Sequence, residues 1–144
     1  MQLNKKNLFL LLALFCCSHA LPQNNGWSKA SGWKLYQIQG NSAFKCTADS
    51  LKNLQNVLLD PDSLNYFLKA ASAWPDDNYP LWMGSYLISY ADLKGGMHKI
   101  DISMYGSFFY DEGMGMGKYF QVPAHLKKGW LAFIRGYYEK LSAP

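Results

Sequence analysis

The pattern of apolar and polar positions divides the chain into an apolar leader and a longer segment of mixed elements. Residues 8–17 form an unbroken apolar run, with two lysines before it and the small residues Ser18 and Ala20 after it. The run is well short of the roughly 20 residues that a permanent membrane helix needs, and small residues at these positions suit signal peptidase. The pattern predicts a signal peptide over residues 1–20, cleaved after Ala20, and a periplasmic or secreted protein.

The cysteines concern how the leader is processed and whether a disulfide can form. Cys17 is an alternative processing point, since a lipoprotein is acylated at such a cysteine, although Phe15 and Cys16 stand where lipoprotein signals carry small residues. After cleavage Cys46 is the remaining cysteine, so no internal disulfide is expected. It is either a buried apolar residue or able to pair between chains. No later apolar run reaches spanning length, and we expect no transmembrane segment.

The mature chain begins with a polar N-terminal segment, residues 21–32, and residues 33–144 have the length of a single domain. Residues 33–38 alternate between apolar and polar, which indicates a strand. A turn at Gly40-Asn41 leads to a second short strand over residues 43–47. We expect these two strands to pair as a hairpin.

Two short helices are predicted next. The first has Asp49 as its N-cap and ends near Leu59, with an apolar face formed by Leu51, Leu54, Val57 and Leu58. The second has Asp60 as its N-cap and Pro61 at its first position, and it ends at Trp74-Pro75. Its apolar face consists of Leu64, Phe67, Leu68 and Ala71.

A long hairpin follows, in which strands over 82–92 and 99–109 flank Gly95-Gly96 as a two-residue turn. This turn would set Asp92 opposite Lys99. One side of the hairpin would then face solvent and carry Tyr86, Tyr90 and Tyr105. The other side would be buried and carry Leu87, Ile102, Met104 and Phe108.

The chain ends with a short strand over 119–122 and a helix that starts at Pro123. One stripe of this helix is apolar and consists of Leu126, Trp130, Phe133, Ile134, Tyr137 and Leu141. The elements together predict an α+β fold, in which an antiparallel sheet packs against the long C-terminal helix and the two short helices are inserted between strands.

Candidate chemistry is sparse. The segment Gly113-Met114-Gly115-Met116-Gly117-Lys118 resembles a phosphate loop, but Glu112 and Tyr119 break the P-loop pattern and Lys118 breaks the dinucleotide pattern. We interpret its glycines as a mobile connection from the sheet to the final helix, with Met114 and Met116 folding over the core. His98 and His125 lie in no zinc or catalytic motif, and no Gly-x-Ser-x-Gly elbow is present. The sequence therefore predicts no enzyme, no cofactor and no metal site.

Charge excludes one class of partner. The chain has 14 basic and 10 acidic side chains, and part of this surplus leaves with the leader. No basic stripe remains, so nucleic-acid binding is not expected. Aromatic residues make up 16% of the chain, which suits a core, a ligand wall or a protein interface alike.

Several short motifs resemble START-type domains of the helix-grip class, in a shortened form. They are Trp33-Lys34-Leu35-Tyr36, the segment from Val57 to Leu64, and the pair formed by Gly115 to Gly117 and Val122 to Leu126. The resemblance implies that a lipid or other small apolar ligand lies between the sheet and the final helix. The implied wall is Leu87, Ile102, Met104, Phe108, Trp130, Phe133 and Tyr137, with Met114 and Met116 as its cover.

A second function class fits the same sequence. Small exported domains without catalytic residues also act as immunity proteins or inhibitors that bind another protein. Tyr86, Tyr90 and Tyr105 on the exposed side of the predicted hairpin would suit such an interface.

Overall fold

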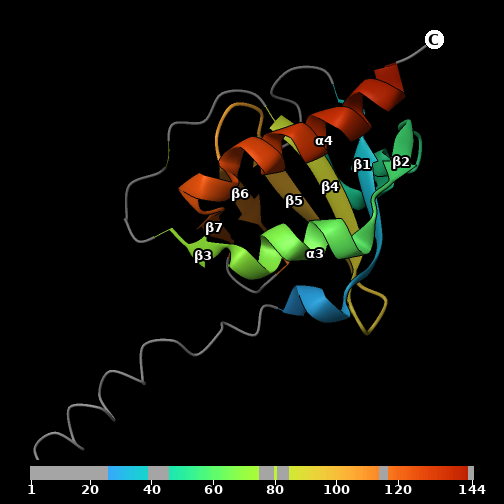
Figure 1. The fold of residues 1–144 in the computed structure, drawn as a ribbon. Coiled ribbons are helices and arrows are strands. Elements are labelled where there is room, and N and C mark those ends of the chain that lie inside the picture. The colour runs from blue at the N-terminus through green and yellow to red at the C-terminus, as the bar shows by residue number, and fades with distance from the viewer. Residues whose placement is uncertain (1–25, 39–45, 75–79, 81–84, 114–116, 143–144) are drawn as a thin grey trace, which may run out of the picture.

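The computed structural model describes residues 26–38, 46–74, 80, 85–113 and 117–142, so the predicted signal peptide lies outside the described residues. Its elements, in chain order, are η2 (Gly26–Lys29), β1 (Ser31–Tyr36), α2 (Ala48–Leu51), β2 (Asn56–Leu58), α3 (Pro61–Ala70), β3 (Ser72–Ala73), β4 (Ser85–Ala91), β5 (Met97–Ser103), β6 (Phe108–Asp111), β7 (Lys118–Gln121), η4 (Ala124–Leu126) and α4 (Lys127–Ser142). A sheet and the long helix α4 dominate the molecule (Figure 1). The predicted α+β class is confirmed.

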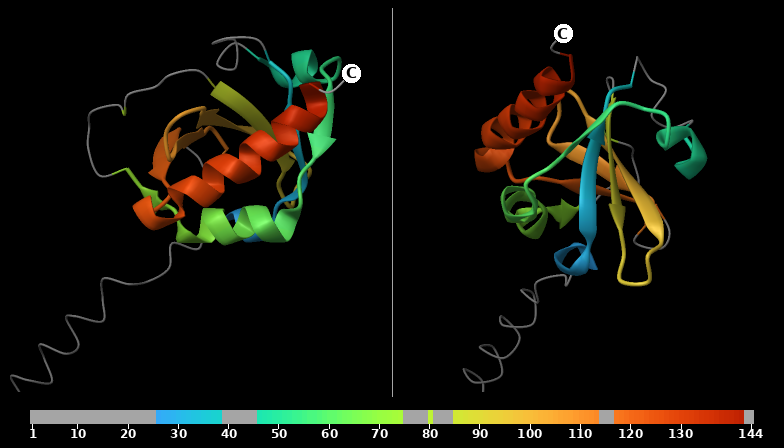
Figure 2. Two further views of the ribbon diagram at one scale, coloured as in Figure 1. Left: turned by 45° about the horizontal axis from the view of Figure 1, so that its top comes forward. Right: turned by 90° about the vertical axis from the view of Figure 1, so that its right-hand side faces the viewer.

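The sheet has seven strands in the order β2-β1-β4-β5-β6-β7-β3, and every neighbouring pair is antiparallel. Helices α4 and α3 cover one face, called here the inner face, and α2 lies against the other, outer face (Figure 2). Strand pairing places Leu35, Ile88 and Ile100 on the inner face. The same pairing places Tyr36, Leu87, Asp101 and Tyr110 on the outer face.

The main core lies between the inner face and the two helices. Its largest fully buried side chains include Trp27, Trp130 and Phe109. The predicted stripe of the final helix is confirmed, because Trp130, Ile134 and Leu141 are buried and Leu126, Phe133 and Tyr137 pack partly buried against the same core. Aromatic side chains bury about 150–250 Å² each, so a short sheet can still build a dense core with them.

The segment after Cys46 differs from the prediction. Helix α2 covers only Ala48–Leu51, and its N-cap is Thr47, which forms a capping box with Ser50. The predicted continuation to Leu59 is wrong, because Asn56–Leu58 form strand β2. The reason is tertiary, since pairing with β1 satisfies backbone groups along an extended segment that the sequence pattern assigns to a helix.

Strand β1 is confirmed, but its predicted partner is not. It pairs with β2 on one side and with β4 on the other. Both of its edges are therefore occupied, and the predicted hairpin between residues 33–38 and 43–47 is wrong. Most of that second predicted strand lies outside the described residues.

Helix α3 begins as predicted, but the predicted end at Trp74-Pro75 is wrong, because the helix ends at Ala70. The Asp60 carboxylate accepts a hydrogen bond from the backbone N–H of Ser63 at 2.9 Å, and Pro61 occupies the first turn. Its buried residues are Leu64, Phe67 and Leu68. The chain then forms the edge strand β3, which pairs with β7. Two residues are too few to show a periodic pattern, so this strand could not be predicted from the sequence.

The β4–β5 hairpin has a different register from the predicted one. Residues 92–96 connect the strands, so Gly95-Gly96 is not a two-residue turn, and Tyr90 pairs with His98 instead of Asp101. The observed pairing differs from the predicted pairing by an odd number of residues. Residues of β4 that were expected on one face of the sheet therefore lie on the other face relative to β5. Tyr86 and Tyr90 are consequently buried on the inner face, and Leu87 lies on the outer face.

The glycine-rich segment joins β6 to β7, so the predicted connection to the final helix is wrong. Two of its glycines are required by close contacts. A Cβ at Gly113 would clash with the Tyr90 hydroxyl and the His98 ring, and one at Gly117 would overlap the Tyr110 hydroxyl. Gly117 also has a φ of +60°, which side chains rarely allow. Met114 and Met116 lie outside the described residues.

Within the described ranges, no helix combines the length and the apolar character needed to cross a bilayer.

Candidate functional site

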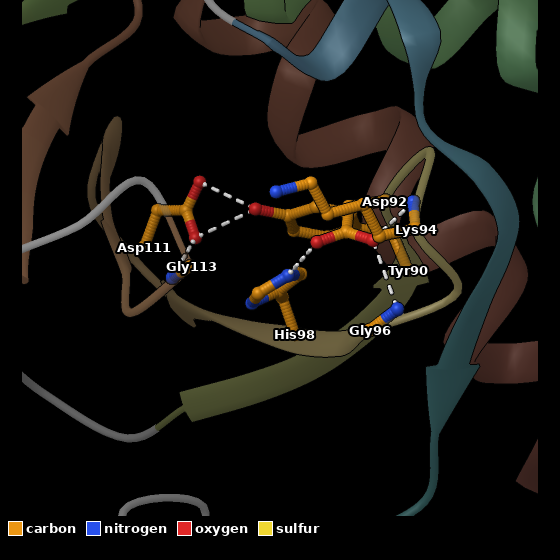
Figure 3. A network of polar contacts seen from close by, with 7 residues as sticks. All are labelled: Tyr90, Asp92, Lys94, Gly96, His98, Asp111 and Gly113. Atoms are coloured by element: carbon orange, nitrogen blue, oxygen red, sulfur yellow. Dashed lines mark hydrogen bonds and ion pairs between the residues drawn. The ribbon is translucent and has the colours of Figure 1, made fainter.

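The connection between β4 and β5, residues 92–96, is a tightly bonded turn that we call the hairpin tip. One carboxylate oxygen of Asp92 accepts hydrogen bonds from the backbone N–H groups of Lys94 and Gly96, each at 2.8 Å (Figure 3). The Asp92 N–H donates to the Gly96 carbonyl at 2.9 Å, and Gly95 has a φ of +79°. These bonds fix the backbone of the tip in one conformation.

A histidine supports the tip from the neighbouring strand. The second carboxylate oxygen of Asp92 lies 2.8 Å from Nε2 of His98 (Figure 3). This hydrogen bond, together with those from the backbone, holds the pKa of Asp92 below its usual value. The His98 ring also packs against Tyr90, with ring centroids 5.3 Å apart. His98 therefore links the tip to the inner face of the sheet.

A buried carboxylate lies beneath this pair. Both oxygens of Asp111 accept from the Tyr90 hydroxyl at 3.1 Å, and one of them also accepts from the Gly113 N–H at 2.8 Å (Figure 3). The indole N–H of Trp27 donates to the other oxygen. Burial raises the pKa of Asp111, and the hydrogen bonds from Trp27, Gly113 and Tyr90 oppose that rise. Burial and the neighbouring Asp111 likewise raise the pKa of Tyr90.

This arrangement provides structural support for the turn. Among the described residues, His98 bonds to Asp92 and to no serine or threonine hydroxyl, which a nucleophilic mechanism would require. The same part of the chain contains no group of three or more His, Cys, Asp or Glu side chains that could hold a metal ion. What the network does is attach η2 and the hairpin tip to one end of the sheet.

The tip and the first residue of β5 together present two apolar side chains to solvent. Leu93 is 75% exposed and Met97, the first residue of β5, is 52% exposed. Lys94 lies between them in sequence and is also exposed. A protruding turn with apolar side chains on a fixed backbone is a common form of recognition element.

The predicted ligand wall is divided among several places. Ile102 and Trp130 are core residues with no accessible surface, and Leu87 lies on the opposite face of the sheet. Met104, Phe133 and Tyr137 are partly buried at the margin of the core. Phe108 is half-buried and packs edge-on against Trp74. The placement of Leu87 on the ligand wall is therefore wrong, for the reason of register given above.

The predicted protein-binding tyrosines are also divided. Tyr105 is exposed, but Tyr86 and Tyr90 are buried, so the predicted interface of three tyrosines is wrong. The Tyr86 ring packs edge-on against Tyr138 of α4. Tyr105 lies near Arg135, whose guanidinium carbon is 6.0 Å from the ring centroid.

Sequence reasoning missed the residues that form the supported tip. Asp92 followed by Gly95-Gly96 was a usable signal, because an aspartate that caps the backbone N–H groups two and four residues later builds a longer turn. Asp111 follows the apolar run Phe108-Phe109-Tyr110, and the sequence contains no sign that its partners would be Trp27 and Tyr90.

Comparisons of the chain with protein-family models, with curated proteins and with solved structures find no match. The resemblance to START-type domains therefore stays a prediction.

Proposed function

We propose that this chain is an exported, non-catalytic binding protein that acts by binding another protein through the hairpin tip. The observation that carries the proposal is the exposure of Leu93 on the tip and of Met97 directly after it, at a turn that Asp92 and His98 hold in place. This is the immunity-protein or inhibitor class that the sequence allows, with a different surface from the predicted one.

The physical support is preorganisation. A loop that is already fixed loses little conformational entropy on binding, so its apolar contacts translate more fully into affinity. The tip is fixed by five hydrogen bonds or ion pairs around Asp92. Its carboxylate is bonded to Lys94, Gly96 and His98, and its backbone N–H and carbonyl are bonded to Gly96 and Gly95. Lys94 would add a cationic contact at the edge of the apolar pair and favour a partner with acidic side chains around an apolar depression.

A small apolar ligand between the inner face and α4, as the resemblance implies, is the second candidate. Met104, Phe133 and Tyr137 support it, because they are partly exposed apolar side chains along the margin of α4. Ile102 and Trp130 have no accessible surface, so a ligand would have to displace them to reach the predicted wall. Displacing packed core side chains costs free energy, and for this reason we place the protein-binding function first.

The test compares three forms of the full chain isolated from their own compartment. The double variant Leu93→Asp with Met97→Asp changes the tip, and Leu58→Asp is the matched control because Leu58 is 65% exposed on β2. We expect wild type and Leu58→Asp to carry the same protein in a fixed ratio. Once that protein is purified, its affinity for the tip variant should fall by about 100-fold.

Two outcomes would contradict the proposal. One is a protein partner whose affinity is the same for the tip variant and for wild type. The other is that native mass spectrometry finds no protein partner but a lipid-sized mass on all three forms, which would favour the apolar-ligand function.

A further inference from the structure

Asp101 is a buried carboxylate that no part of the hairpin tip uses. It lies on β5, in the middle of the sheet order, and its side chain has no accessible surface. Within the described part of the chain, neither carboxylate oxygen has a hydrogen-bond partner. Buried polar groups are normally paired, and a buried ionised carboxylate without donors is among the most costly groups a fold can contain.

Several polar groups share the outer face with Asp101 and have other partners. Tyr110, the cross-strand neighbour of Asp101 on β6, packs against the Tyr119 ring with centroids 4.8 Å apart. Lys99, two residues before it on the same strand, forms an ion pair with Glu112 at 3.0 Å. The Tyr36 and Ser89 hydroxyls are hydrogen bonded to each other at 3.0 Å. Ser103 accepts from the Gly106 N–H at 3.2 Å. The nearest histidine in sequence, His98, is on the inner face beside Tyr90.

Asp101 also adjoins the smaller of the two hydrophobic clusters. This outer cluster consists of the buried residues Tyr36, Ile38, Leu51 and Leu87, with Cys46 and Leu54 packed partly buried against it. Leu87 is the direct cross-strand neighbour of Asp101. Helix α2, which has only four residues, contributes Leu51 to this cluster. A cluster this small is the kind of unit that opens locally without global unfolding.

We propose that Asp101 is a proton-controlled switch for the packing of the outer cluster. With the carboxyl group neutral, the outer cluster packs over it and α2 stays in place. When the carboxyl group ionises, the charge requires water or a donor that the folded outer face does not supply, so the cluster loosens and α2 becomes exposed to solvent.

The pKa of Asp101 determines the pH range in which the switch would respond. Burial is the main cause that raises the pKa of Asp101 to about 6. The positive charge of Lys99 opposes this rise, and the negative charge of Glu112 adds to it. Lys99 lies on β5 and Glu112 directly follows β6, while the direct cross-strand neighbours of Asp101 are the apolar Leu87 on β4 and the titratable Tyr110 on β6. The outer cluster should therefore be closed in mildly acidic surroundings and loosened in neutral ones.

The experiment is amide hydrogen exchange of the full chain at about pH 5 and about pH 7.5, corrected for the intrinsic pH dependence of exchange. The compared forms are wild type, Asp101→Asn and the control Asp62→Asn, which removes an exposed aspartate from the first turn of α3. At about pH 7.5 we expect residues 46–54 to exchange about tenfold faster in wild type than in Asp101→Asn. At about pH 5 this difference should vanish, and Asp62→Asn should match wild type at both values.

A second variant tests the same switch without changing the buried group. Glu112→Gln removes an anion that raises the pKa of Asp101 and frees Lys99 from its ion pair, and Glu112 is half exposed, so the fold should tolerate the change. We expect the loosening of residues 46–54 to occur at lower pH in this variant than in wild type.

Three results would overturn the proposal. The first is equal exchange of residues 46–54 in wild type and Asp101→Asn at about pH 7.5. The second is a midpoint that Glu112→Gln leaves unchanged. The third is an equal acceleration of exchange in α4, which would make the effect a property of the whole fold and not of the outer cluster.

Discussion

Asp111 and Asp101 are fully buried aspartates on neighbouring strands, and they lie on opposite faces of one sheet. Asp111, on the inner face, accepts hydrogen bonds from Trp27, Tyr90 and Gly113. Asp101, on the outer face, accepts none from any residue that the structure describes. Burial raises the pKa of both, but only at Asp111 do hydrogen bonds oppose that rise.

The difference teaches that burial alone does not identify a functional group. The inner carboxylate has a structural explanation, because it ties η2 to a strand 84 positions further along the chain. Among the described residues, the outer carboxylate has no hydrogen bond that would explain its burial. A group that is costly and structurally unexplained is the better candidate for a functional or regulatory role.

The largest effect is expected from Asp111→Ala. Removing this carboxylate leaves the Trp27 N–H, the Tyr90 hydroxyl and the Gly113 N–H without their acceptor in a buried site. Each unsatisfied buried donor costs about 1–3 kcal/mol, so the free energy of unfolding should fall by about 3 kcal/mol or more. Urea unfolding measures it, with Asp62→Ala as the exposed control. A loss below about 1 kcal/mol would show that Asp111 is not a structural anchor.

Replacing the outer carboxylate, Asp101, should have the opposite effect on the free energy of unfolding at neutral pH. The pKa of Asp101 rises from 3.8 to about 6 on folding, so the folded state binds its proton more tightly than the unfolded state does. The stabilisation is therefore complete below about pH 4 and is lost as pH rises through about 6, by about 2–3 kcal/mol from this group.

Asp101→Asn should accordingly raise the free energy of unfolding at about pH 7.5 and flatten its decline between about pH 4 and pH 7. Urea unfolding across this range measures the slope. Asp111 contributes in the same direction, since its pKa is also raised, so the comparison is between wild type and Asp101→Asn at each pH. A destabilised Asp101→Asn at neutral pH would reverse the contrast between the two faces.

The smallest effect is expected from removing single hydroxyl groups. Tyr90→Phe deletes the donor to both oxygens of Asp111, a charged acceptor, and should cost about 1.5–3 kcal/mol at the upper end of single hydrogen bonds. Tyr36→Phe deletes a neutral bond to Ser89 on the outer face and should cost about 0.5–1.5 kcal/mol. Thermal unfolding of both variants measures the ranking, and an equal or inverted order would contradict a stronger network on the inner face.

Elements with local signals were predicted correctly. Helix α3 begins where Asp60 and Pro61 place it, and α4 buries the stripe that contains Trp130 and Ile134. Both follow from contacts within a few residues along the chain, namely a cap and a helical repeat. The candidate site was not predicted, because Trp27, Tyr90 and Asp111 are brought together only when η2 reaches β4 and β6.

The sequence by itself determined the α+β class, the two well-marked helices and the existence of a long hairpin, because caps, helical periodicity and alternation are properties of short segments. Tertiary structure decided the register of that hairpin, and with it whether Tyr90 or Leu87 faces α4. Tertiary structure also made Asn56–Leu58 a strand, and it left Asp101 without a hydrogen-bond donor among the described residues. The physical reason is that register and hydrogen-bond satisfaction depend on partners far along the chain, and a single offset between strands exchanges the buried and exposed faces.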